Sequence, residues 1–160
     1  MMLKRKELPM LVFSILMPQV IGLIGAYFTL PSITSWYLYL DKPFINPPNW
    51  IFGPVWTALY FLMGASFFLV LRRGISKKTI KPIQIFLLQL LFNLLWSIVF
   101  FFFHSIFGGL IAIVILWVLI LITILKFSKI SSLASILLIP YLAWVTFATV
   151  LNVMLWMLNK

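Results

Sequence analysis

The sequence contains no cysteine, and its only acidic residues are Glu7 and Asp41. Without cysteine the chain can form no disulfide, and it offers neither a thiolate metal ligand nor a cysteine nucleophile. His104 is the only histidine, so two-histidine ligation of a haem within one chain is excluded. No Ser-His-Asp set or metal cluster can be assembled from these residues. The sequence therefore gives no support to an enzyme that works by acid–base or metal catalysis.

Charged residues are also scarce, at 9% of the chain, whereas hydrophobic residues make up 64%. A soluble domain of 160 residues could not bury so large an apolar share. The composition therefore predicts an integral membrane protein. Because backbone polar groups in hydrocarbon must pair internally, we predict an all-α bundle of transmembrane helices.

The apolar stretches are long enough for five spans, since a bilayer-crossing helix needs about 20 residues. The stretch 83–125 carries no charge and would be about 65 Å long as one helix, roughly two bilayer thicknesses. It must turn back once, and the polar, flexible residues between 104 and 109 mark the turn. We therefore expect a single domain, 1–160, with helices near 8–30, 51–71, 83–103, 106–125 and 133–158.

The net charge of +10 is concentrated between the apolar stretches. Basic residues cluster at Lys4–Lys6, within 72–81, and at Lys126 and Lys129. This placement is typical of loops that set orientation and meet anionic lipid headgroups, and it argues against nucleic acid as a partner. The positive-inside rule predicts a cytoplasmic N-terminus, with the C-terminus and the segment 31–50 outside. We find no cleavage or transit pattern, and we expect a bacterial plasma membrane.

The segment 31–50 differs from the apolar stretches that flank it. Pro43 and the pair Pro47-Pro48 disfavour helix and favour extended backbone. Connections of this length are usually functional lids or binding loops. A plain aromatic belt at the membrane interface, with Trp36 and Trp50 as members, is the alternative. We interpret the segment as an ordered lid.

Three predicted spans carry aromatic, polar or small residues at i, i+4 and i+8, a spacing that places them on one helix face. Buried polar residues in a membrane usually have a role, and for Gln89 and Asn152 the alternative role is hydrogen bonding between helices. Tryptophan and tyrosine rings suit a cavity for a large, planar, mostly apolar ligand. We expect the stripes to converge beneath the segment 31–50. They are Trp56, Tyr60 and Gly64; Gln89, Asn93 and Ser97 beside Trp96; and Trp144, Ala148 and Asn152 after Tyr141.

The chain resembles the tryptophan-rich sensory protein or translocator protein family, also called the peripheral benzodiazepine receptor family. The resemblance lies in three blocks, at 36–64, 89–101 and 140–152, which cover parts of four spans and most of the long loop. It implies a five-helix bundle, often a homodimer. It also implies a pocket under the first loop for porphyrins such as protoporphyrin IX and for isoquinoline- or benzodiazepine-like molecules.

The stripes and the resemblance together predict a set of ligand-binding residues, with no metal site and no resident cofactor. Some bacterial members of the family are linked to light-dependent porphyrin breakdown, which makes Trp56 and Trp144 the catalytic candidates. The cholesterol motif of animal members is not carried over, because Val153 and Met157 replace its tyrosine and its basic residue. The predicted ligand-binding residues are Trp36, Trp50, Trp56, Tyr60, Asn93, Trp96, Tyr141, Trp144, Ala148 and Leu151.

The function predicted from the sequence is that of a membrane receptor or sensor that binds porphyrins, linked to porphyrin homeostasis or stress response. The first alternative is light- and oxygen-dependent porphyrin degradation through excited porphyrin and tryptophan radicals. The second is transport of tetrapyrroles or lipids, although the sequence lacks the internal repeats and intramembrane charges common in transporters.

Overall fold

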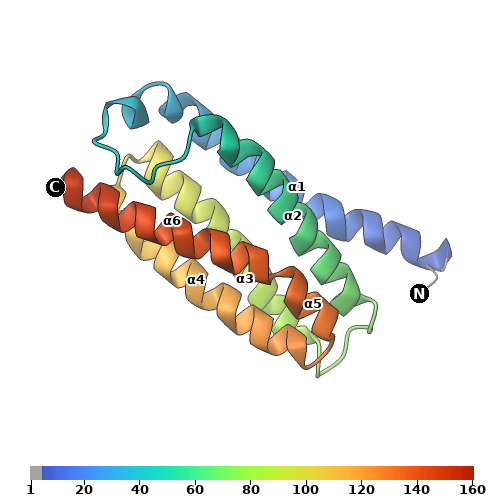
Figure 1. Ribbon diagram of the computed structural model, residues 1–160. Coiled ribbons are helices and arrows are strands. Elements are labelled where there is room, and N and C mark those ends of the chain that lie inside the picture. The colour runs from blue at the N-terminus through green and yellow to red at the C-terminus, as the bar shows by residue number, and fades with distance from the viewer. Residues whose placement is uncertain (1–4) are drawn as a thin grey trace.

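The computed structural model describes residues 5–160, and this part of the chain contains helices and no strand (Figure 1). Two short 3-10 turns, η1 and η2, precede α1 and α2, and a π-helical turn, η3, continues α3. The elements are η1 (Arg5–Glu7), α1 (Leu8–Ile33), η2 (Trp36–Tyr39), α2 (Asn49–Leu71), α3 (Ile80–Ser97), η3 (Ile98–Phe102), α4 (Ile106–Ser128), α5 (Ser132–Leu137) and α6 (Ile139–Leu158).

Five helical segments are long and apolar enough to cross a membrane. The predicted all-α bundle of five transmembrane helices is therefore confirmed, and the lipid bilayer is its environment. The ends of the five spans lie within three residues of the predicted ends; α1, for example, continues to Ile33 rather than ending at 30. The last span is built from α5 and α6 in succession.

The turn that divides the long apolar stretch lies where the sequence predicts it. The π-helical turn ends at Phe102, and α4 begins at Ile106. His104 has a φ of 53°, in the left-handed region that a tight turn requires. The Ser105 hydroxyl then accepts a hydrogen bond from the Gly108 N–H at 3.1 Å, which caps the start of α4.

The two chain ends lie at opposite ends of the bundle (Figure 1). The α2–α3 loop and the α4–α5 turn lie at the same end as η1, so most of the basic residues gather there, whereas Lys42 and Lys160 lie at the other end. At this end Arg72 Nε donates to Glu7 Oε1 at 2.6 Å. Lys4, a member of the predicted N-terminal cluster, lies outside the described residues. That this end faces the cytoplasm stays a prediction.

The half of the bundle next to these basic loops is filled by side chains, and we call it the packed half. The Phe67 and Phe86 rings stack with centroids 4.6 Å apart, and Phe86 stacks on Phe127 at 5.6 Å. The Ser66 hydroxyl donates to the Ala134 carbonyl at 2.7 Å, joining α2 to α5. On α2, Gly64 allows a close approach of α1, because a Cβ there would lie 2.6 Å from the Ile15 Cα.

Candidate functional site

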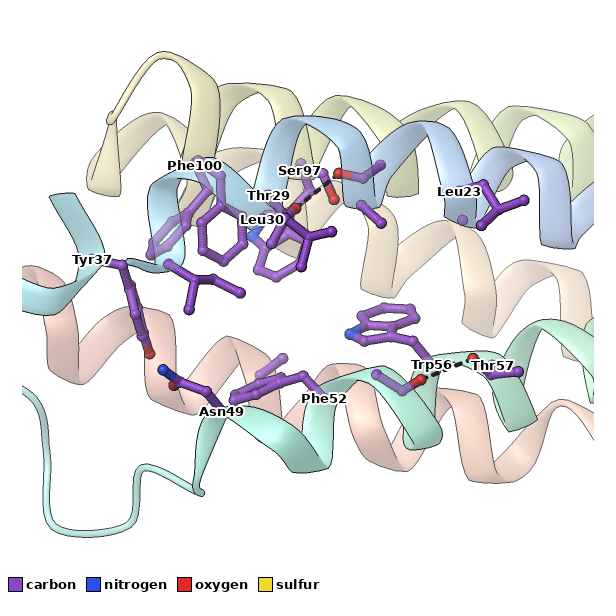
Figure 2. Close-up of a pocket in the computed structure, with 18 of the residues that line it drawn as sticks. Leu23, Thr29, Leu30, Tyr37, Asn49, Phe52, Trp56, Thr57, Ser97 and Phe100 are labelled. Atoms are coloured by element: carbon purple, nitrogen blue, oxygen red, sulfur yellow. Dashed lines mark hydrogen bonds between the residues drawn. The ribbon is translucent and has the colours of Figure 1, made fainter. Parts of the chain in front are cut away.

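The opposite half of the bundle encloses a cavity of about 430 Å³, and we call it the hollow half (Figure 2). This volume lies within the range of small-molecule sites, roughly 300–1,000 Å³. No charged residue of the described part of the chain lines it. Among residues 5–160 there is also no group of three His, Cys, Asp or Glu side chains that could hold a metal ion. The walls come from α1 (19–33), α2 (49–60), α3 with η3 (96–101) and α6 (148–155), with Tyr37 at one end.

Aromatic rings form much of the wall, and the Trp56 ring projects into the open space (Figure 2). The Trp56 ring lies 5.5 Å from the Tyr60 ring and 6.3 Å from the Trp96 ring, with interplanar angles of 29° and 32°. Trp96 stacks in turn on Phe100 at 5.8 Å. The Trp96 indole N–H donates to Asn152 Oδ1 at 3.3 Å, which fixes the ring against α6. The cavity therefore presents flat apolar faces to a ligand.

The π-helical turn η3 brings two consecutive aromatic residues to the cavity. Phe100 and Phe101 both line it, and their rings meet edge to face at 4.8 Å. Tyr37 packs on this pair, at 6.3 Å and 5.8 Å. The wider turn of a π-helix shifts side-chain directions and is frequent at functional sites.

The longest wall comes from α1, and the sequence analysis did not predict it. Gly22, Gly25, Ala26 and Thr29 all line the cavity. These small residues stand at i, i+3, i+4 and i+7, so they share one face of α1. At Gly22 a Cβ would lie 2.2 Å from the Tyr60 ring, so only glycine leaves room for that ring. The spacing of small residues was the signal that could have revealed this wall.

The residues 34–48 connect α1 to α2 at this end of the bundle, and we call them the cap segment. Its Tyr37 hydroxyl donates to Asn46 Oδ1 at 2.8 Å. Burial raises the pKa of Tyr37 to about 12, although the hydrogen bond with Asn46 lowers it in part. Lys42 Nζ donates to the Leu38 carbonyl at 3.0 Å and lies 5.0 Å from the Tyr37 ring centroid, within cation–π distance. These contacts order the cap segment internally.

The cap segment is also tied to the end of α6. The Asn159 side chain accepts from the Asp41 N–H at 3.0 Å and donates to the Asp41 carbonyl at 2.9 Å. Trp36 stacks on the His104 ring at 4.6 Å. His104 Nε2 in turn lies 3.3 Å from the Ser32 hydroxyl. The segment is thus held on both sides of Tyr37.

A chain of buried hydrogen bonds forms the floor between the hollow and packed halves, and we call it the polar layer. The Tyr60 hydroxyl donates to Asn93 Oδ1 at 2.6 Å. Asn93 Nδ2 donates to the Tyr141 hydroxyl at 3.0 Å, and that hydroxyl donates to Gln89 Oε1 at 3.0 Å. The layer joins α2, α3 and α6. Only Tyr60 among its members lines the cavity.

Six of the ten predicted ligand-binding residues line the cavity: Trp50, Trp56, Tyr60, Trp96, Ala148 and Leu151. The other four have different surroundings. Asn93 and Tyr141 belong to the polar layer, and Trp36 packs on His104 outside the cavity. Trp144 packs on Phe52 and Phe147, and its buried indole N–H has no partner among residues 5–160. That these residues bind a ligand stays a prediction.

The difference follows from helix geometry. Each residue advances by about 100° around an α-helix, so positions four apart are rotated by about 40° and positions eight apart by about 80°. On α3, Asn93 therefore faces Tyr141 while Ser97 faces the cavity. On α6, Ala148 and Asn152 line the cavity while Trp144 packs beside it.

Comparisons with known proteins agree with this architecture. The model of the TspO/MBR family matches residues 14–157. The chain is 42% identical to the "Tryptophan-rich protein TspO" of Archaeoglobus fulgidus, over 93% of this chain and 96% of that protein. It is 36% identical to the "Tryptophan-rich sensory protein" of Cereibacter sphaeroides, over 78% and 77% of the two chains. It is 32% identical to the "Translocator protein" of Bos taurus, over 91% and 87%.

Proposed function

The chain belongs to the TspO/MBR family, and we propose that it is a membrane receptor or sensor for protoporphyrin IX and related planar, largely apolar molecules. The names of its relatives, sensory protein and translocator protein, support a sensor or transporter role in the membrane. The observation that carries the finer proposal is the Trp56 ring, which stands in an uncharged cavity in the membrane-spanning part of the chain.

The chemistry of the walls suits a tetrapyrrole-like ring. The Trp56 and Trp96 rings, which are tilted by 32° to one another, offer extended π-faces for stacking. The Ser97 hydroxyl and the Trp56 indole N–H line the cavity without a hydrogen-bond partner among residues 5–160. A ligand with acceptors on its ring or its edge can use both groups. Shape, stacking and hydrogen bonds would hold such a ligand.

Titration of protoporphyrin IX into the purified protein, followed by quenching of tryptophan fluorescence, tests this function. Truncation of a buried aromatic anchor typically costs about 2 kcal/mol of binding or more, which is about 30-fold in Kd. We expect that loss for Trp56→Ala. Trp117→Ala is the matched control, because Trp117 bonds to Thr146 on α6 and does not line the cavity. Equal affinity of both variants and the wild type would contradict the proposal.

A Trp144→Ala variant tests the wider set of residues predicted from the sequence. The Trp144 ring contacts Phe52, which does line the cavity. We therefore expect a weaker effect than for Trp56→Ala, transmitted through Phe52. An effect as large as that of Trp56→Ala would place the ligand against both rings.

Light- and oxygen-dependent porphyrin breakdown is a second candidate function. It is favoured by the rings around Trp56, since Tyr60, Trp96 and Tyr141 lie 5.5 Å, 6.3 Å and 6.2 Å from it. Such neighbours could stabilise an oxidised tryptophan next to an excited porphyrin. The test compares loss of porphyrin absorbance in light and in darkness, with Trp56→Phe as the control. Loss equal to that in detergent alone would rule this function out.

A further inference from the structure

The cavity reaches the surface of the bundle between α1 and α2. Leu23, Leu30 and Trp50 all line it, yet these residues are 70%, 63% and 73% exposed. Residues that border the cavity and are also this exposed mark the place where it opens outward. Leu23 and Leu30 belong to α1 and Trp50 to α2, and both helices are membrane spans. The opening therefore faces lipid along its length.

A single polar bridge closes the inner end of this opening. Gln19 Nε2, on α1, donates to the Thr57 carbonyl of α2 at 3.0 Å. Both residues line the cavity, and both also line an outer groove that continues over Ala58 and Phe61. The Gln19–Thr57 bridge therefore separates the cavity from a groove on the lipid-facing side of the same two helices.

The cap end of the cavity is closed in a different way. Within the cap segment, hydrogen bonds join Tyr37 to Asn46 and Lys42 to Leu38. Two more hydrogen bonds join the Asp41 backbone to the Asn159 side chain. A ligand passing through the cap segment would have to break several of these bonds. Passage between Leu23, Leu30 and Trp50 requires only that apolar side chains move within lipid.

We propose that ligands enter and leave this cavity sideways from the bilayer, through the opening between α1 and α2, while the cap segment stays closed. The inference rests on the proposed function and specifies its ligand class: planar molecules that partition into the membrane first and bind with the apolar ring in the cavity, while ionised groups such as the propionates of protoporphyrin IX stay outside its walls. The uncharged walls support this class, because an ionised group moved into them would lose its hydration without gaining a partner.

Gly53 provides the sharpest test of the route. It lines the cavity on α2, and a Cβ built there meets nothing within 4 Å. The Cβ of a Gly53→Leu side chain therefore has room, the rest of that side chain should narrow the opening, and helix propensity is not lost. The readout is stopped-flow quenching of tryptophan fluorescence by protoporphyrin IX, with the protein in lipid nanodiscs.

A narrowed passage slows association and dissociation together, whereas a lost contact raises only the dissociation rate. For Gly53→Leu we expect both rates to fall on the order of tenfold, the low end of the range spanned by mutants of one binding site. Leu23→Ala should instead raise the association rate, because it removes an exposed side chain and so widens the opening.

The control locks the cap segment. The chain contains no cysteine, so a variant with both Asp41→Cys and Asn159→Cys has a single pair of thiols. The two positions lie close together, because the Asn159 side chain is hydrogen-bonded to the Asp41 backbone. Oxidation of this pair should leave the association rate unchanged. Slower association with the locked cap, or unchanged rates in both Gly53→Leu and Leu23→Ala, would overturn the sideways route while the receptor function stands. No quenching by the wild type would overturn the receptor function, and the route with it.

Discussion

In the packed half of the bundle the buried rings of Phe67, Phe86 and Phe127 stack on one another, whereas in the hollow half Trp56 and Trp96 border a cavity of about 430 Å³. Both halves are rich in aromatic side chains, and α2 and α3 contribute to both. An abundance of aromatic residues therefore does not by itself indicate a binding site. Whether aromatic rings fill the space between helices or line a cavity depends on the residues of the facing helix.

In the hollow half the facing residues form the small-residue face of α1. Gly22 lies directly against the Tyr60 ring, and Gly25 and Ala26 on the same face add little side-chain volume to the cavity. In the packed half, large side chains such as Met63, Leu116 and Ile120 are fully buried around the phenylalanine stack. The polar layer lies between the two regions and fixes α2, α3 and α6 relative to one another.

The largest effect on stability is expected from Phe86→Ala in the packed half. Phe86 is fully buried between two stacked rings, so truncation leaves a cavity that the neighbours cannot fill. We expect the free energy of unfolding to fall by about 3–5 kcal/mol, measured by denaturation in mixed micelles. Phe103→Ala, at a side chain that is mostly exposed, is the control and should change stability little. Similar losses for the two variants would remove the distinction between the halves.

A smaller loss of stability is expected from a substitution in the polar layer, where the two halves meet. Asn93→Leu leaves the buried hydroxyls of Tyr60 and Tyr141 without their shared partner. The expected cost is about 1–2 kcal/mol, because hydrogen bonds between transmembrane helices are individually modest. Porphyrin affinity should also fall, since Tyr60 loses its fixed position in the cavity wall.

The control for this variant is Thr146→Val, which breaks the interhelical hydrogen bond from Trp117 on the lipid-facing side. It should lower stability without changing porphyrin affinity. If Asn93→Leu also left affinity unchanged, the polar layer would have no part in shaping the cavity.

The tie between the cap segment and α6 should have a smaller and local effect. Asn159→Ala removes both hydrogen bonds to the Asp41 backbone. Such an exposed pair of hydrogen bonds contributes roughly 1 kcal/mol to the stability of the cap segment. We therefore expect faster amide hydrogen exchange around residue 41 and unchanged exchange at Phe86. Exchange that rises throughout the bundle would mean that the cap segment supports the global fold.

The smallest effect concerns pH. Burial raises the pKa of Tyr37 from its ordinary value near 10 to about 12, so the folded cap holds this proton more tightly than the unfolded chain does. The resulting stabilisation is complete below about pH 10 and is lost as the pH rises from 10 to 12. Proteolysis of the cap segment should accelerate across that window. Tyr37→Phe, which cannot ionise, should show no such step; a step of equal size in the variant would assign it to another group.

The sequence was sufficient to predict the five spans and the turn near His104, because apolar length and the position of polar breaks are visible without tertiary contacts. The convergence of Trp56, Tyr60 and Trp96 also followed from their spacing. The α1 wall was not predicted, because the wall residues were sought among aromatic and polar side chains, whereas α1 lines the cavity with glycine and other small residues. The placement of Trp144 was missed because a stripe at i, i+4 and i+8 rotates around its helix.

Two further features depend on tertiary structure. The π-helical turn that aims both Phe100 and Phe101 at the cavity has no pattern in the sequence. The pairing of Asn93 with Tyr60 and Tyr141 depends on how three helices meet, so spacing within one helix could not show whether its amide faces a ligand or another side chain.

A structure determined with saturating protoporphyrin IX would show whether the hollow half is the binding site. We expect the porphyrin ring in the hollow half, against Trp56 and Trp96, with the polar layer beneath it unbroken. An unoccupied cavity at saturation, or a porphyrin bound on the outer surface with the Trp56 ring out of contact, would contradict this expectation.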